Sequence, residues 1–178
     1  MGAAITTNTE QPRIYVACLA AYNNGYLHGA WIDAAQEPWS IYDAVRVMLT
    51  ASPIEGAEEW AIHDYEGFGG VRIEEHASFD RVSELAAFLA EHGGIGAALL
   101  DYYSGDLAEA REALEDRHLG EYASLADYMQ DMTEESTAIP NSLRYYIDWQ
   151  AMARDAELNG DLFTVSTAWD VVHVFAGC

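Results

Sequence analysis

The sequence contains no lysine and only two cysteines among its 178 residues. All eight basic residues are arginines, and they stand against 30 acidic residues, so the formal net charge is −22. A chain with this charge is repelled by nucleic acids and anionic membranes and is attracted to basic clefts. Cys18 and Cys178 form no CxxC pair, which excludes a cysteine zinc motif and is typical of a reducing compartment. These absences predict a cytoplasmic protein that does not bind nucleic acid directly.

Long apolar runs and the short motifs of common enzymes are missing as well. No run has the length of a membrane span and no signal-peptide pattern occurs, so we expect no membrane contact. Gly67 and Gly93 lie in stretches that lack the third glycine of the dinucleotide fingerprint, and a Walker motif requires lysine. An EF-hand loop beginning at Asp101 would place Asp106 where glycine is needed, and the histidines lack metal-ligand spacing. We therefore expect no cofactor, no metal and no enzymatic activity.

Acidic residues are abundant, and they are concentrated in one segment. Residues 101–135 contain eleven carboxylates and two arginines, a formal balance of −9. Apolar residues recur there at helical spacing, as at Leu107, Ala110 and Leu114, so the segment is predicted to form helices rather than a disordered tail. The acids then lie on the opposite half of each helix, where neighbours three or four positions apart repel by a few tenths of a kcal/mol per pair. Such a surface is either simply solvated or is a binding surface for a partner whose usual ligand carries closely spaced negative charges.

The helix before this segment shows the same segregation. It is predicted to begin near Phe79 and to end at Gly93-Gly94, with apolar residues on one face and acids on another. Duplex nucleic acid presents charges at similarly short intervals, about one per 1.7 Å of axis. The predicted acidic surface comprises Asp80, Glu84, Glu91, Asp106, Glu109, Glu112, Glu115, Asp116, Glu121, Asp127, Asp131, Glu134 and Glu135.

The N-terminal part is predicted to form a ββαβ unit. Two apolar runs, residues 14–22 and 27–34, flank Asn24-Gly25, which is the strongest short signal for a hairpin turn. A helix capped by Ser40 and stopped by Pro53 is expected to follow. A third strand is expected from Trp60 to Tyr65.

The segment from Pro140 to Asn159 is predicted as one helix, because proline suits the first helical position and Asn159-Gly160 suits the end. It carries two apolar stripes on opposite sides, and one core can cover only one of them. We expect the second stripe to be buried by a neighbouring domain or, as we favour, by a second copy of the chain. Residues 162–167 and 171–175 are predicted to close the chain as a β-hairpin.

These elements predict an α+β fold made of three small domains. The predicted divisions are a flexible tail (1–12), an N-terminal α+β domain (13–76), an acidic helical middle domain (77–138) and a C-terminal helix and hairpin (139–178). The formal charges of residues 1–76, 77–138 and 139–178 are −8, −11 and −3. The middle domain is therefore expected to be the most acidic.

Five segments of the sequence resemble the ArdA antirestriction proteins. They are IYVACLAAYNNGYLHGAWIDA (14–34), AIHDYEGF (61–68), GEYASLADYM (120–129), YYIDWQAMARDAELNGDLF (145–163) and VHVF (172–175). Together they cover nearly the whole chain, in order. One segment alone is moderately specific, but five in sequence are strongly so.

The resemblance implies a protein of mobile genetic elements that imitates B-form DNA and occupies the DNA-binding cleft of type I restriction-modification enzymes. It also implies an elongated molecule, with three domains in a curved row that pair through the C-terminal domain into a homodimer. The family's antirestriction segment falls near Pro140 to Trp149 here. The dimer contact is accordingly assigned to Leu143, Tyr145, Tyr146, Trp149 and Met152.

The charge itself is consistent with this resemblance, since 22 net charges correspond to about 37 Å of duplex axis. Two alternatives remain open. In the first, the protein is an acid-rich globular protein of a halophile, and its charge serves solubility only. In the second, it is an enzyme with an unrecognised acidic active site, because a pair of carboxylates could act as acid and base.

Overall fold

The computed structural model of the chain describes residues 10–178, and within them it shows helices together with two three-stranded antiparallel sheets. The predicted α+β class is confirmed. The described residues form two compact units, 10–105 and 106–178. Each unit contains 15 acidic residues and four arginines, so each carries a formal charge of −11. The division into three domains in an elongated row stays a prediction.

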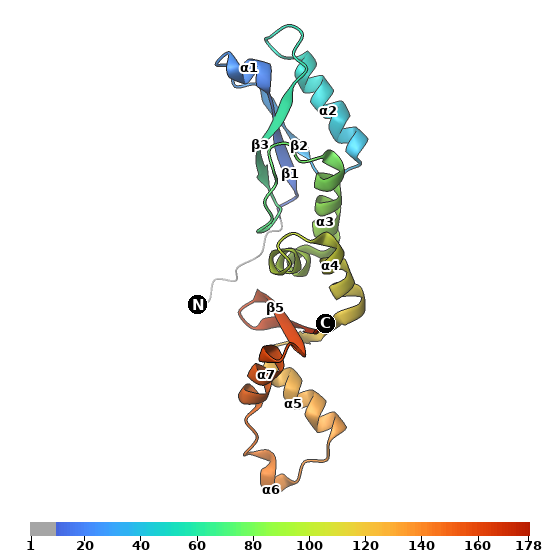
Figure 1. Cartoon of the computed structure of the whole chain (residues 1–178), viewed down its shortest axis with the longest axis vertical. Helices are drawn as coiled ribbons and strands as arrows, with labels where there is room; N and C mark the ends of the chain where they lie inside the picture. Colours follow the sequence, from blue (N-terminus) through green and yellow to red (C-terminus); the bar gives the residue numbers. More distant parts are fainter. Residues whose placement is uncertain (1–9) are drawn as a thin grey trace. The chain divides into compact units, whose positions relative to one another are not determined.

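The first unit is a three-stranded sheet covered on one face by helices (Figure 1). Its elements are β1 (Arg13–Cys18), α1 (Leu19–Asn23), β2 (Gly29–Asp33), α2 (Pro38–Thr50), β3 (Trp60–Glu66) and α3 (Phe79–Tyr102). The strand order is β2-β1-β3, so the predicted ββαβ pairing is confirmed. The core contains Ile14, Val16 and Val45, and the Phe79 ring of α3 stacks on Trp60 at a centroid distance of 4.4 Å.

The predicted tail lies mostly outside the described residues, but its last residues are in view. Gln11 donates a hydrogen bond from Nε2 to Asp33 Oδ2 at 2.6 Å. The Pro12 carbonyl accepts a hydrogen bond from the Ala34 amide at 2.9 Å. These contacts join residues 11 and 12 to the end of β2.

The Asn24-Gly25 pair ends a helix instead of turning a hairpin, which corrects the prediction. Residues Leu19–Asn23 form α1, so a helix and a loop join β1 to β2, although the two strands pair as expected. Gly25 has a φ of 83°, and the Tyr26 amide donates to the Ala21 carbonyl at 3.0 Å. This is the usual glycine end of a helix. Helix ends and hairpin turns both use a residue of positive φ, so the dipeptide alone does not separate them.

The predicted cap of α2 at Ser40 is also wrong. Glu37 is the N-cap and Pro38 is the first helical residue. Proline suits this position because its φ is already helical and its missing N–H would have had no partner in the first turn. The helix ends at Thr50, before Pro53, as predicted.

The predicted stop at Gly93-Gly94 coincides with a sharp kink at which two helical segments meet. Helix α3 continues to Tyr102, and Gly93 alone departs from helical geometry, with φ 54° and ψ −131°. This conformation is open to glycine because it has no Cβ. The kink separates the acidic first part of α3 from an apolar second part that contains the buried Leu99 and Leu100.

The second unit is built around the other three-stranded sheet. Its elements are α4 (Leu107–Glu112), the π-helical turn η1 (Ala113–Arg117), β4 (His118–Tyr122), α5 (Leu125–Ser136), α6 (Asn141–Arg144), α7 (Trp149–Leu158), β5 (Leu162–Ala168) and β6 (Val171–Ala176). The strand order is β4-β6-β5, and the predicted closing hairpin is confirmed as β5 and β6. Helices α5 and α7 meet the sheet through a core that includes Leu125, Tyr128, Ala153 and Val174.

The single helix predicted from Pro140 to Asn159 is wrong. Helix α6 ends at Arg144, and α7 begins at Trp149 with Asp148 as its N-cap, whose carboxylate accepts from the Ala151 amide at 2.9 Å. An interrupted helix does not present two continuous apolar stripes. The side-chain oxygen of Asp148 supplies the start signal for the second helix.

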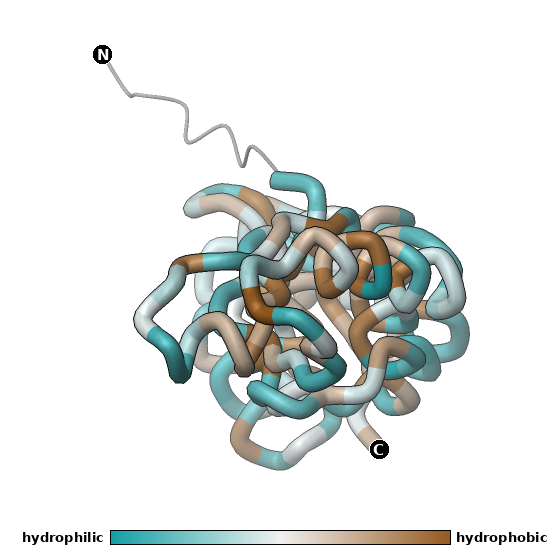
Figure 2. Tube along the Cα trace, turned by 90° about the horizontal axis from the view of Figure 1, so that it is seen from above, coloured by the Kyte–Doolittle hydropathy of each residue, from teal (hydrophilic) through white to brown (hydrophobic). Residues whose placement is uncertain are grey.

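Hydrophilic and hydrophobic residues alternate over short intervals along the chain trace (Figure 2). Short alternation is typical of amphipathic elements that each cover a small core. No helix among residues 10–178 has the length and apolar character to cross a membrane.

Gly93→Ala is expected to lower the free energy of unfolding by about 1–3 kcal/mol, because alanine must adopt a backbone conformation that suits only glycine. No atom lies within 4 Å of the added Cβ, so the loss comes from the backbone alone. Urea unfolding followed by circular dichroism measures it. Gly94→Ala is the control, since Gly94 has helical angles and alanine there should not destabilise. Equal losses in the two variants would contradict the prediction.

Candidate functional site

The clearest acidic stripe lies on the first part of α3. Asp80, Glu84 and Glu91 are exposed on one side of the helix, while Val82 and Leu89 are buried on the other. This is the arrangement that the spacing predicted. Ser78 caps the helix by accepting from the Arg81 amide at 3.2 Å, and Asp80 lies in the first turn, where a negative charge is favoured by the helix dipole.

The acids of α4 and η1 are not placed as a regular α-helix would place them. Asp106 is the N-cap of α4, and its Oδ1 accepts from the Ala108 amide at 3.0 Å. After Glu112 the backbone follows i→i+5 hydrogen bonds, so the predicted spacing of 100° per residue does not extend to Glu115 and Asp116. Both side chains are exposed, but they do not continue the row of acids predicted along one side of a regular α-helix.

Arg117, in η1, pairs with two of the predicted surface acids. Its Nη2 lies 3.2 Å from Glu109 Oε2 and 3.6 Å from Glu112 Oε1. Its Nη1 donates to Cys178 Sγ at 2.8 Å, and the side chain is buried. Glu109 and Glu112 therefore face a fixed positive charge and are not wholly free for a partner. The spacing of five residues from Glu112 to Arg117 gives no signal on an α-helix, where pairs form at three or four.

Helix α5 carries the second clean stripe. Asp127, Asp131 and Glu135 are exposed along it. Ser124 caps the helix by accepting from the Asp127 amide at 3.1 Å, and its hydroxyl donates to Asp127 Oδ2 at 2.6 Å. Glu134 is half-buried and lies 3.2 Å from Arg144 Nη1, so it is partly neutralised.

Glu121 lies on a strand and not on a helix, which corrects the prediction for this residue. It is in β4, directly opposite His173 of β6. Its Oε2 lies 4.0 Å from His173 Nε2. This strand was not predicted, because β4 is short and its residues are exposed or only half-buried.

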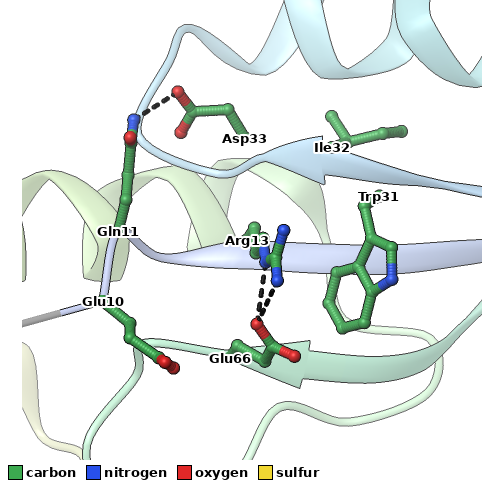
Figure 3. Close-up of a pocket in the computed structure, with 7 residues that line it drawn as sticks. All are labelled: Glu10, Gln11, Arg13, Trp31, Ile32, Asp33 and Glu66. Atoms are coloured by element: carbon green, nitrogen blue, oxygen red, sulfur yellow. Dashed lines mark hydrogen bonds and ion pairs between the residues drawn. The ribbon is translucent and has the colours of Figure 1, made fainter.

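A surface pocket lies on the open face of the first sheet (Figure 3). Arg13 lies over the Trp31 ring, with its guanidinium carbon 4.7 Å from the ring centroid, and donates from Nε and Nη2 to Glu66 at 2.8 and 2.6 Å. Glu10 and Asp33 line the same pocket. These acids were not singled out from the sequence, because the acidic surface was sought on helices.

The residues assigned to a dimer contact fall into two groups. Leu143, Tyr145 and Tyr146 are 55%, 93% and 85% exposed, around the break between α6 and α7. Trp149 and Met152 are half-buried, and Trp149 packs against the core of its own unit. Tyr145, Tyr146 and Trp149 line a shallow pocket beside the start of α5.

Chemically, each of the two stripes is a set of ordered carboxylates on an exposed helix face. Carboxylates bind guanidinium and ammonium groups through charge-assisted hydrogen bonds. Among residues 10–178, no three histidine, cysteine or acidic side chains come together as metal ligands.

A family model described as antirestriction protein (ArdA) matches residues 14–171 of the sequence. The chain belongs to the ArdA family. The resemblance drawn from the five sequence segments is thereby confirmed, and membership implies that this ArdA protein has an antirestriction function. A comparison with curated proteins finds no significant match.

Arg117→Met is expected to lower the free energy of unfolding by about 1.5–3 kcal/mol, because it removes charge-assisted hydrogen bonds and leaves Glu109 and Glu112 to repel each other. The loss should shrink as salt rises, since salt screens the exposed carboxylates. Thermal unfolding at 0.05 and 0.5 M NaCl measures both effects. Arg154→Met on the exposed face of α7 is the control and should have little effect. A loss that does not depend on salt would show that packing alone is responsible.

Proposed function

We propose that the protein occupies the DNA-binding cleft of a type I restriction-modification enzyme by presenting carboxylates in place of phosphates. The observation that supports this most directly is the pair of exposed acidic stripes on α3 and α5, each opposite an apolar face. Ordered helices hold these charges, so little freedom is lost when a basic cleft binds them. The family match supports an antirestriction role for the protein.

The amount of charge suits the proposal. Each compact unit carries −11, which corresponds to about 19 Å of duplex axis, and the whole chain to about 37 Å. Long-range attraction would raise the association rate, and rising salt would weaken the complex. No bond is made or broken in this mechanism, so the protein acts as an inhibitor and not as an enzyme. Its proposed place of action is the cytoplasm of a cell that receives a mobile element. Three small domains in an elongated row are part of the same proposal.

A competition assay tests the proposal. The protein should displace a labelled duplex from the methyltransferase core of a type I enzyme at 0.1 M salt, with weaker displacement at higher salt because the charges are screened. Failure to displace the duplex at any salt concentration would overturn the proposed mechanism.

The stripe on α3 can be tested by Asp80→Asn, Glu84→Gln and Glu91→Gln combined. Loss of three ion pairs with the cleft should weaken competition by about 1–3 kcal/mol, or roughly 5- to 150-fold.

A matched control removes three exposed charges outside the predicted surface, by combining Glu55→Gln, Glu58→Gln and Glu59→Gln. Both triple variants have the same net charge, so the control should compete nearly as well as the unchanged protein. Equal weakening would show that only total charge matters. That result, with a fold that requires molar salt, would favour the halophile alternative.

We also propose that the chain pairs through the exposed residues around the break between α6 and α7. Leu143, Tyr145 and Tyr146 expose apolar surface there, and exposed aromatic residues are common anchors of interfaces. The shallow pocket beside the start of α5 adjoins them and offers a place for contacts with the second copy.

Combined Tyr145→Ser and Tyr146→Ser should convert the dimer to a monomer, because they remove the two most exposed aromatic groups of this surface. Sedimentation velocity over a range of concentrations measures the change. Trp169→Ser is the control, since Trp169 is 93% exposed in the hairpin turn and lies outside the proposed contact. A dimer that survives the double change would place the interface elsewhere.

A further inference from the structure

Two histidines meet across neighbouring strands of the second sheet. His173 Nδ1 on β6 lies 3.3 Å from His118 Nε2 on β4, within hydrogen-bond distance. His173 is 8% exposed, whereas His118 is exposed at the edge of the sheet. The His118 ring also lies on the Phe175 ring, with 4.9 Å between centroids. The contact therefore joins the edge strand β4 to the central strand β6.

The second nitrogen of His173 is also engaged. His173 Nε2 lies 3.3 Å from Thr167 Oγ1 on β5. The carboxylate nearest to this nitrogen in the described structure is that of Glu121 on β4, at 4.0 Å. The side chain of Glu121 is 62% exposed, so water weakens its attraction for a protonated ring. All three strands of the sheet thus contribute a side chain to the surroundings of His173.

The other charged group near this face is a cation. Arg117 of η1 lies over the Phe163 ring, 6.0 Å from its centroid, and Phe163 of β5 stacks on Phe175. The charged and titratable groups given by these contacts are His118 and Glu121 from β4 and Arg117 from η1. Arg117 is itself paired with Glu109 and Glu112 of α4. Glu121 is the carboxylate that lies 4.0 Å from the His173 ring.

A hydrogen bond between two imidazole rings needs one ring to donate and the other to accept. Neutral rings satisfy this, and so does a pair with one added proton. A second added proton leaves two donors and no acceptor, with two positive charges at a distance of 3.3 Å. The contact between the two rings is then repulsive. Since His118 lies on the edge strand β4, this repulsion acts on the attachment of that strand.

We propose that the His118–His173 contact is an acid-sensitive link that fastens β4 to β6 near neutral pH and releases it when both rings are protonated. The consequence extends beyond the strand, because β4 connects η1 to α5. Release of β4 loosens the attachment of the acidic residues on either side, in α4, η1 and α5. This inference concerns the stability of the second unit and does not depend on the proposed inhibitory function.

The direction of titration agrees with the geometry. Burial, and then the neighbouring His118, lower the pKa of His173 below its usual value of 6.5. The unfolded chain therefore binds more protons than the folded chain between the two pKa values, so stability is greatest above pH 6.5 and falls as the pH falls below it.

The test compares urea unfolding at pH 5.5, 6.5 and 7.5 for the unchanged protein, His173→Asn and His76→Gln. The unchanged protein and His76→Gln, which alters an exposed histidine of the first unit, should both lose stability as the pH falls. In His173→Asn most of that loss should disappear, because asparagine does not titrate. The same loss in His173→Asn and His76→Gln would overturn the proposal.

Amide hydrogen exchange in the unchanged protein gives a second test that does not require a stable variant. After correction for intrinsic rates, amides of the β4–β6 ladder should lose protection between pH 7.5 and 5.5, and amides of the β5–β6 ladder should lose less. His118→Gln, a change at an exposed position, should reduce the difference between the two ladders. Unchanged protection of the β4–β6 ladder over this range would overturn the proposal.

Discussion

Repulsion between like charges is the constraint that the rest of this structure accommodates. Each compact unit carries 15 acidic residues and four arginines, and each must fold around a small core. Exposed acids three or four positions apart cost a few tenths of a kcal/mol per pair, whereas a fully buried large apolar side chain contributes about 1.5–3 kcal/mol. The balance is favourable because most of the acids lie on exposed surfaces, away from the two cores. Phe79 and Leu125 then remain available for the two cores.

The ion pairs formed by the arginines determine which acids remain available to bind a basic partner. Arg13 is bonded to Glu66 on the first sheet, Arg117 to Glu109 and Glu112, and Arg144 to Glu134. The exposed stripes of α3 and α5 lie outside these pairs, so negative charge is concentrated on them. A count of carboxylates along the sequence overestimates the effective surface, because it does not show which acids an arginine will reach.

The periodicity of apolar residues correctly predicted those parts of the fold that consist of one regular helix or one regular hairpin. The stripe of α3 follows from alternating apolar and acidic residues at helical spacing, and the closing hairpin follows from two short apolar runs around a turn. Local backbone choices were not predictable in this way. A second helical segment follows directly after Gly93, the turn at Ala113–Arg117 adopts a π-helical form, and Asp148 starts a new helix inside an apolar pattern. The spacing of apolar and acidic residues does not specify these local backbone conformations.

Strand β4 illustrates why the site of the second unit was only partly predictable. Its residues are mostly exposed, so it lacks the alternation that identifies a strand, yet it joins the acids of α4 and η1 to those of α5. Its pairing with β6 is irregular between His118 and Gly120 and regular from Gly120 to Tyr122. The side-chain contact of His118 with His173 adds to the attachment at the irregular end. How firmly the carboxylates of α4, η1 and α5 keep their mutual spacing therefore depends on how firmly this edge strand is attached to β6.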